Sequence, residues 1–250
     1  MSHPFIRTTR SAVDVRNGRR DWFRIQNATS AEAEIFIYDE IGFFGITAKD
    51  FRDELATVTA PRVALHINSP GGDVFDAVAI YNAIRTHPAD VTAYVDSLAA
   101  SAASFIALAA DKVVMAKHSQ MMIHDAWGMA VGNADDMRKM SDFLAKQTDI
   151  IAAIYAERAG KDVAHWRGLM AEETWFSDEE AVAAGLAHEV GAAVAVKNTF
   201  DLSVFRRVPI NDGSHGSEEP VEEAQPDGWQ AEALLAIAEA ELEIAHANAQ

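Results

Sequence analysis

The chain has 250 residues, of which 49% are hydrophobic, enough for one sizeable core with appendages. Its 38 acidic and 21 basic residues give a net charge of -17, which argues against nucleic-acid binding because phosphate recognition needs clustered Lys and Arg. The lack of cysteine excludes a disulfide scaffold or a thiolate metal site and suits a reducing cytosol, so we expect a cytoplasmic protein.

The polar, Arg-rich stretch at residues 1–33 predicts a solvated or partner-binding N-terminal arm. No apolar run follows its arginines, so it is not a secretory signal. The best candidate for a membrane span, Ser97–Ala110, is short and mostly Ala and Ser, whereas a span needs roughly 20 apolar residues. We therefore expect no contact with a membrane.

Strand and helix patterns then alternate along the chain. β-type or buried apolar runs predict strands at Glu34–Tyr38, Val63–Ile67, Val91–Val95, Val113–Met115 and Met121–Ile123. Helical spacing predicts helices at Ile46–Ala56, Asp73–Arg85, Ser101–Ala110 and Asp135–Ala159. Such alternation indicates an α/β domain with a largely parallel sheet, which we place at residues 34–200.

The composition changes after about residue 200. Residues 211–250 contain ten acidic side chains and no Lys or Arg. Helix breakers occupy the first half of this segment, and Trp229–Ala247 then has the pattern of an amphipathic helix. We interpret residues 201–250 as a flexible acidic tail whose one helix needs a partner surface.

Three motifs could carry chemistry, although each alone has a structural explanation. Asn68–Gly72 lies between a strand and a helix, where glycines let backbone N–H groups approach an oxyanion or form a plain tight turn. Ser101 begins a small-residue helix, either as a nucleophile or as an N-cap, and Ser97 and Ser104 are rival nucleophiles. His124 ends an apolar strand and is either a structural histidine or the base that a serine nucleophile needs.

Taken together, these motifs resemble the ClpP family of serine peptidases. The INSPGG turn, the AAS nucleophile motif and the MIH base motif occur in that family's order. A later stretch, Glu173–Ala181 followed by Ala184–Leu186, is similar to the family's FLSAxEAxxxGL pattern. The resemblance extends over residues 34–190 and implies a ClpP/crotonase-like fold of repeated ββα units with a long protruding helix.

The resemblance also implies the roles of individual residues. Ser101 would be the nucleophile and His124 its general base, with the N–H groups of Gly72 and Ala102 forming the oxyanion hole. The third triad position falls on Glu173, where the family usually has Asp. A Glu can orient an imidazole, but this position and the adjacent Glu172 could equally be solvated surface acids. No cofactor and no metal are expected.

Two further features bear on the place of the chain within the family. Asp125 and Ala126 follow the base, where the family typically has a proline. Four short stretches of the sequence are most similar to the phage-encoded branch of the family, whose members are described as head-maturation proteases. These stretches are Trp22–Ile25, Ile37–Ile41, Gly72–Asp76 and Glu173–Trp175. The polypeptide substrate would then be a capsid or scaffold protein.

The family assembles as stacked seven-membered rings that meet through a long helix, here Asp135–Ala159. We accordingly expect a homo-oligomer, and dependence on an AAA+ unfoldase stays open. The sequence leaves three alternatives: a crotonase-like acyl-CoA enzyme, a non-catalytic assembly module and a Ser-Lys peptidase. The presence of Ser101, His124 and the paired glycines together favours the serine endopeptidase.

Overall fold

A computed structural model describes residues 25–26, 31–43, 45–196, 200, 202 and 205–207. The chain divides into two compact units, residues 1–209 and 210–250. All of the described residues belong to the first unit. Most of the predicted N-terminal arm, and the helix predicted at Trp229–Ala247, lie outside the described residues.

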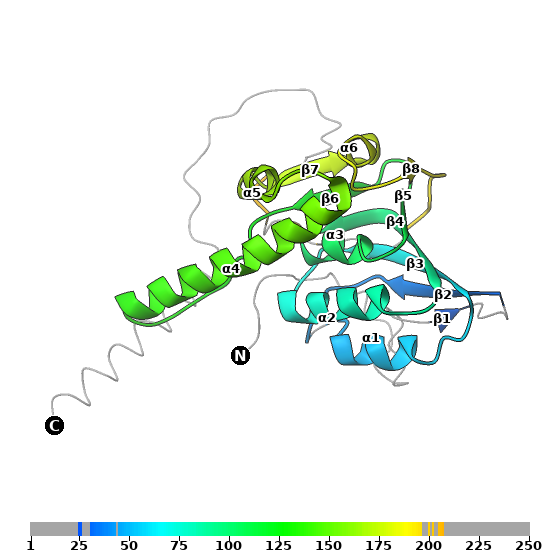
Figure 1. The fold of residues 1–250 in the computed structure, drawn as a ribbon, viewed down its shortest axis with the longest axis horizontal. Helices are drawn as coiled ribbons and strands as arrows, with labels where there is room; N and C mark the ends of the chain where they lie inside the picture. Colours follow the sequence, from blue (N-terminus) through cyan, green and yellow to red (C-terminus); the bar gives the residue numbers. More distant parts are fainter. Residues whose placement is uncertain are drawn as a thin grey trace. The chain divides into compact units, whose positions relative to one another are not determined.

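The first unit is built on one mixed sheet with the strand order β1-β2-β3-β4-β5-β8 (Figure 1). Strands β2, β3, β4, β5 and β8 run parallel, whereas β1 is antiparallel to β2. β6 pairs in parallel with the far end of β4 and antiparallel with β7. The bounds are β1 Ile25–Gln26, β2 Glu32–Ile37, β3 Arg62–Ser69, β4 Asp90–Ala100, β5 Lys112–Met115, β6 Gln120–Ile123, β7 Thr174–Ser177 and β8 Glu189–Val190.

The longest strand, β4, differs most from its prediction, since the apolar run suggested an end at Val95. The strand continues to Ala100 because it has two partners in succession. Thr92–Val95 pairs with β5, and Leu98–Ala100 pairs with β6. This second pairing brings the end of β4 beside the end of β6, where the predicted nucleophile and base follow.

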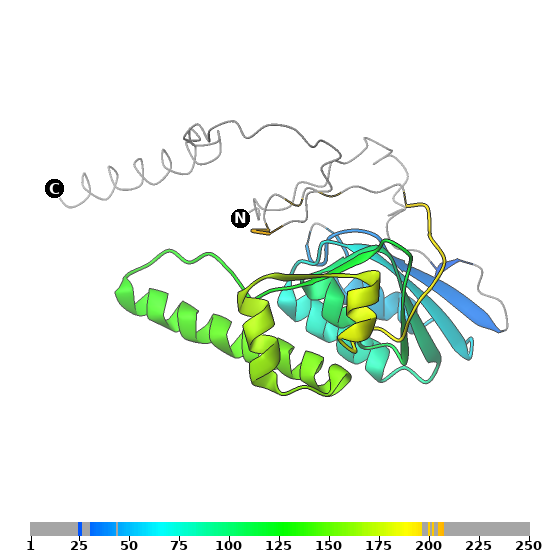
Figure 2. The same ribbon diagram turned by 90° about the horizontal axis from the view of Figure 1, so that it is seen from above.

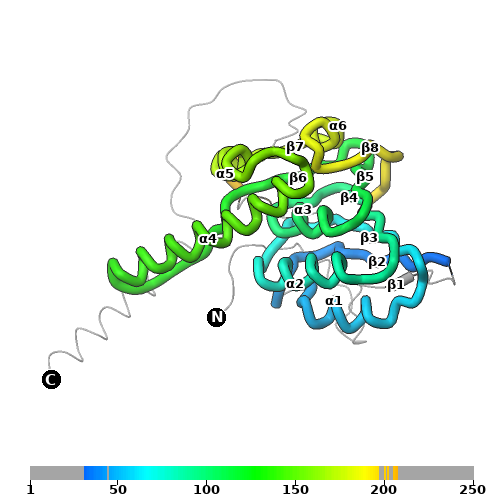
Figure 3. The backbone as a smooth tube through the Cα atoms, in the orientation of Figure 1, coloured from blue at the N-terminus to red at the C-terminus, as the bar shows by residue number. Residues whose placement is uncertain are grey.

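Six helices complete the described part of the chain. α1, α2 and α3 lie on one face of the sheet, as two perpendicular views show (Figures 1 and 2). α4 extends well past the edge of the sheet (Figure 3). The helices are α1 Ala48–Leu55, α2 Val74–Arg85, α3 Ala102–Ala107, α4 Ala134–Ala159, α5 Val163–Ala171 and α6 Asp178–Ala183. The predicted α/β architecture with a mostly parallel sheet is confirmed.

The core lies between the sheet and these helices. Strand β3 supplies a nearly continuous buried run between its parallel neighbours β2 and β4. α2 begins where the Asp73 carboxylate accepts hydrogen bonds from the first helical N–H groups. α4 begins at a capping box formed by Asn133 and Asp136, and it ends at Gly160 in the left-handed conformation.

α4 contacts the core only through its second half. Its buried residues are Thr148, Ile151, Ala152 and Tyr155, all beyond the helix midpoint. The Tyr155 and Ser104 hydroxyls lie 2.7 Å apart, and the Ser104 hydroxyl donates to the Ser101 carbonyl at 2.5 Å. Because the single Ser104 proton is used in that bond, Tyr155 is the donor to Ser104. This chain of hydrogen bonds connects α4 to the backbone of Ser101.

Replacing Tyr155 with Phe tests this connection. The variant leaves the buried Ser104 oxygen without its donor, so we expect the free energy of unfolding to fall by about 1–3 kcal/mol. Tyr81→Phe is the matched control, because Tyr81 is only partly buried, and it should change stability by no more than about 0.5 kcal/mol. Chemical denaturation at one fixed protein concentration measures both; equal effects would contradict the connection.

Candidate active site

The serine that follows β4 has an unusual backbone. Ser101 has φ 52° and ψ -122°, a region that residues other than glycine rarely occupy. Its N–H donates to the carbonyl of Met122 on β6 at 2.9 Å, and its carbonyl accepts from Ser104. Such strain persists only where the surroundings enforce it, and it is common at catalytic residues. Here it directs the hydroxyl out of the sheet at the start of α3.

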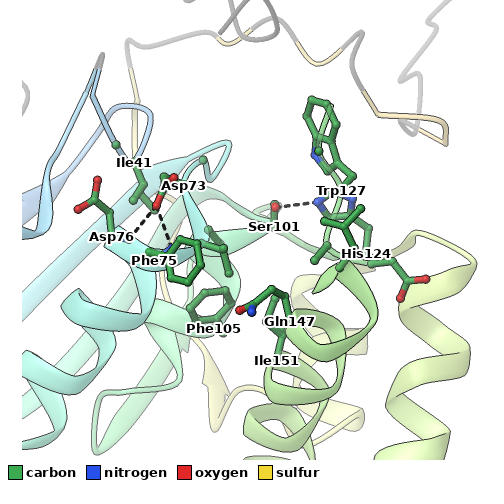
Figure 4. Close-up of a pocket in the computed structure, with 18 of the residues that line it drawn as sticks. Ile41, Asp73, Phe75, Asp76, Ser101, Phe105, His124, Trp127, Gln147 and Ile151 are labelled. Carbon is green, nitrogen blue, oxygen red and sulfur yellow. Dashed lines mark hydrogen bonds between the residues drawn. The ribbon is translucent and has the colours of Figure 1, made fainter. Parts of the chain in front are cut away.

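His124, the residue after β6, faces this hydroxyl (Figure 4). Its Nε2 lies 2.7 Å from the Ser101 Oγ, the distance of a hydrogen bond that can transfer the serine proton. The two rival serines are placed differently. Ser97 is exposed on β4, and Ser104 is fully buried against Tyr155. Ser101 is thus the serine that this histidine contacts.

The paired glycines after β3 approach the same turn. A Cβ on Gly71 would lie 2.7–2.8 Å from the Ala100 carbonyl oxygen, the Ala102 nitrogen and the Ser101 Cβ, closer than real Cβ contacts come. Only glycine therefore permits this approach. The neighbouring Gly72 lines the same cavity as Ser101 and Ala102.

Among the described residues, two backbone N–H groups at this approach have no hydrogen-bond acceptor. Ile41 bonds to the residues on either side of Gly72, so the Gly72 N–H points away from Ile41. Ala102 is the first residue of α3, a position whose N–H has no partner within a helix. Neither N–H has an acceptor within the described part of the chain, and both residues line the cavity that Ser101 lines. Such donors suit a developing oxyanion.

The third predicted residue, Glu173, is buried close to His124 but does not bond to it. Its carboxylate accepts hydrogen bonds from the backbone N–H groups of Arg206 at 2.8 Å and Arg207 at 2.6 Å, and from the Trp175 indole at 3.3 Å. Over the described residues, no hydrogen bond joins Glu173 to the histidine ring. The neighbouring Glu172 is exposed and pairs with the Arg207 guanidinium at 2.7 Å.

Burial has the largest effect on the pKa of His124. It lowers the pKa of His124 to about 4, although the nearby Glu173 charge raises that pKa and the Arg206 charge lowers it further. The imidazole is therefore neutral and able to accept a proton at neutral pH. Asp125 follows the base, and burial raises the pKa of its carboxyl.

Ser101 lines a cavity of about 520 Å³ with a largely aromatic and aliphatic wall. Figure 4 shows its side chains arranged around Ser101 and His124. The apolar wall comes from α2, α3, α4 and the loop before α4, with Phe75, Phe105, Trp127, Phe143 and Ile151 among its residues. Such a wall would accept an apolar side chain beside the hydroxyl.

The described residues were also compared with the requirements of a metal site and of a membrane span. Within the described residues, no group of three or more His, Cys, Asp or Glu side chains is placed to hold a metal ion. The described helices are too short or too polar to cross a bilayer.

A hydrogen-bonded Ser and His beside unpaired backbone donors defines a serine hydrolase site on an α/β fold. Comparison with known proteins narrows this class, because residues 17–194 match the family model for Clp protease. The ATP-dependent Clp protease proteolytic subunit 1 of Protochlamydia amoebophila is 31% identical over 174 residues, covering 67% of this chain and 84% of that protein.

Two further relatives carry the same description. The subunit from Gloeobacter violaceus is 31% identical over 69% of this chain and 90% of its own length. The one from Prochlorococcus marinus subsp. pastoris is 32% identical over 54% of this chain and 70% of its own length. The chain therefore belongs to the Clp protease family and is a serine-type endopeptidase with the ClpP-like fold.

Sequence reasoning missed the segment around Phe205, which it assigned to the tail. Leu202 and Phe205 pack against the sheet with Phe200, in a cluster that includes Leu98 and Met122. The signal was present as apolar residues at alternate positions, Phe200, Leu202 and Val204, followed by Phe205. The proposed boundary at residue 200 stays a prediction, but described residues beyond it reach the active site.

The histidine environment predicts an unusual pH dependence. The pKa of His124 is lowered from its ordinary value of 6.5 to about 4, so the imidazole stays neutral, and active, well below pH 6.5. We expect kcat/KM for a short peptide to fall only as the pH approaches 4. A pH profile between 3.5 and 8 measures this, with stability checked separately at each pH. A midpoint at 6.5 or above would contradict the burial of the ring.

The oxyanion donors can be tested at the start of α3. Ala102→Pro deletes one N–H at the first helical position, where the fixed φ of proline is tolerated. Loss of a single oxyanion donor typically lowers kcat about a hundred- to a thousandfold. Circular dichroism and melting temperature control for the fold. A folded variant with kcat near wild type would reject the Ala102 donor.

Proposed function

We propose that this endopeptidase cuts polypeptides by a serine mechanism with Ser101 as nucleophile, His124 as general base and Glu173 as the associated acid. The observation that carries the proposal is the 2.7 Å contact between Ser101 Oγ and His124 Nε2 beside the unpaired donors of Gly72 and Ala102. The family membership supports the same reaction.

The steps follow from the geometry. His124 Nε2 takes the hydroxyl proton while Ser101 Oγ bonds to the scissile carbonyl carbon, whose oxygen becomes negative and receives the two backbone N–H groups. The imidazolium then gives its proton to the leaving amine, which departs as the C–N bond breaks. A water molecule, deprotonated by the same histidine, attacks the acyl carbon; the C–O bond to Ser101 Oγ then breaks, the imidazolium returns its proton to the serine oxygen, and the product leaves as a carboxylic acid.

The role of Glu173 is electrostatic in this proposal. Its charge raises the pKa of His124 and thereby favours the imidazolium that forms during attack. This role acts through charge and needs no direct hydrogen bond between Glu173 and the histidine ring.

The oligomeric chamber belongs to the proposal as well. α4 projects from the body, and its apolar residues Met137, Phe143 and Ile150 are exposed. The loop before it exposes Met129 and Val131. We propose that copies of the chain associate through this surface into stacked rings, which would enclose the active sites and admit only unfolded polypeptides.

The substrates and partners are proposed from two sources. The relatives are named as subunits of ATP-dependent proteases, which supports an AAA+ unfoldase partner. The short stretches that are similar to the phage-encoded branch support a role in phage head maturation. The acidic composition of residues 211–250 suits contact with a capsid or scaffold substrate. The cysteine-free composition suits action in the cytoplasm, that of the host if the chain is phage-encoded.

The nucleophile is tested by Ser101→Ala. Removing the attacking oxygen should abolish cleavage of a fluorogenic peptide with an apolar residue before the scissile bond, while melting temperature and native mass stay near wild type. Ser97→Ala is the matched control and should keep its activity. Turnover in Ser101→Ala within tenfold of wild type would sink the proposal. Cleavage of purified capsid protein, measured with and without an AAA+ unfoldase and ATP, tests the proposed substrate and the proposed partner separately.

The acid is tested by Glu173→Gln, which keeps the side-chain shape but loses the charge. We expect kcat to fall by orders of magnitude because the imidazolium loses its stabilising charge. Glu172→Gln, at an exposed position, should change kcat by less than about twofold. If Asp125→Asn is slow and Glu173→Gln is not, the acid is Asp125.

A further inference from the structure

A short segment beyond the family match touches both His124 and Glu173. We name Phe205–Arg207 the strap; it lies after residue 194, where the Clp protease match ends. The Phe205 side chain is buried, with its ring centroid 5.7 Å from that of His124 and 5.8 Å from that of Trp175, edge-to-face in both cases. The strap therefore closes one side of the catalytic histidine.

The next two residues of the strap hold the acid through their backbone. The Arg206 N–H donates to one carboxylate oxygen of Glu173 and the Arg207 N–H to the other. Glu173 is only 7% exposed, and it adopts a left-handed φ of 51°. A buried carboxylate needs such donors, because an unpaired buried charge is strongly unfavourable. The two N–H groups thus fix where the negative charge lies.

The position of that charge matters to His124. Glu173 is the group that raises the pKa of the histidine, against the larger effect of burial. A carboxylate that turned away into solvent would lose this influence, since Coulomb interactions are weak in water. Two backbone donors at 2.8 and 2.6 Å on the two oxygens of one carboxylate restrict that movement.

We propose that the strap is a positioning element of the active site, which holds the Glu173 carboxylate beside His124 and shields the imidazole from water. This inference rests on the proposed function, in which Glu173 stabilises the imidazolium. Phe205 lines the active-site cavity and packs against the His124 ring, whereas Arg206 and Arg207 act through Glu173. Glutamate is one methylene longer than the family's usual aspartate, and the strap supplies the donors that fix this longer side chain.

A matched pair of variants isolates the backbone donor. Arg206→Pro and Arg206→Ala both remove the guanidinium, but only the proline removes the N–H that Glu173 accepts. We expect kcat of Arg206→Pro to be about ten- to a hundredfold below that of Arg206→Ala, with KM changed by less than about threefold. The acidic limb of the pH profile should also lie lower in Arg206→Pro, because the charge that raises the His124 pKa is no longer held nearby.

A double-mutant cycle distinguishes positioning from a general loss of structure. In the Glu173→Gln background, the difference between the proline and alanine variants should shrink to less than about twofold. An undiminished difference there would overturn the proposal, as would equal kcat for the two variants in the wild-type background. A kcat higher for Arg206→Pro than for Arg206→Ala would also overturn it, since the strap would then hold the Glu173 carboxylate away from His124.

A second pair covers the case in which the proline variant does not fold. Phe205→Ala removes the ring that covers His124, so water should reach the imidazole and the acidic limb should move to higher pH with lower kcat. Phe205→Leu keeps an apolar cover and should restore most of both properties. An unshifted limb in a folded Phe205→Ala variant would contradict the shielding role.

The same measurements separate this proposal from the proposed function. Loss of activity in Ser101→Ala establishes the nucleophile whatever the strap does. If Glu173→Gln keeps wild-type kcat, the acid in the proposed function is wrong and the strap has nothing to position. If Glu173→Gln is slow but the two Arg206 variants are alike, only the strap proposal fails.

Discussion

The active site depends on one close approach between two backbone turns. The glycine pair after β3 packs against the turn at Ser101 so closely that a Cβ on Gly71 would lie 2.7 Å from the Ala100 carbonyl oxygen. Gly72, Ser101 and Ala102 line the same cavity. In the proposed mechanism, a wider separation would leave a serine and a histidine in contact but no site for the oxyanion. The orientation of the donors, rather than the identity of any single side chain, makes the hydroxyl useful.

The surrounding structure holds Ser101 in its strained conformation. A residue in such a region costs on the order of 1–3 kcal/mol, and hydrogen bonds at both ends of Ser101 offset that cost. Its N–H bonds to Met122 on β6, and its carbonyl is reached by Ser104, which Tyr155 of α4 contacts in turn. Because His124 directly follows β6, the contact that restrains the proposed nucleophile also aligns its proposed base. The helix proposed to mediate assembly is thereby connected to Ser101.

The sequence predicted the parts of this arrangement that local pattern controls. Apolar runs located the strands, and the N-cap at Asp73 and the Gly160 terminus agree with predicted helix ends to within a residue. The order of the glycine, serine and histidine motifs identified the residues that the structure brings together. Their meeting follows from topology, since the ends of the parallel strands β3, β4 and β6 lie at one edge of the sheet.

Other features could not be predicted because they depend on tertiary contacts. The end of β4 was wrong by several residues, since its second partner, β6, is distant in sequence. The hydroxyl chain through Tyr155 joins residues that are 51 apart. Residues 205–207 lie outside the family motifs, and their sequence carries no catalytic pattern. Only their contacts with Glu173 and His124 reveal a role.

The most direct test of this account is where an activated serine forms. A fluorophosphonate reacts with a serine only when a base and an oxyanion site activate it. Peptide mass mapping of the labelled wild-type protein should find one adduct, on Ser101, and His124→Ala should lose that adduct while remaining folded. An adduct on Ser97 or Ser104, or equal labelling of Ser101 without the histidine, would contradict the proposed catalytic geometry.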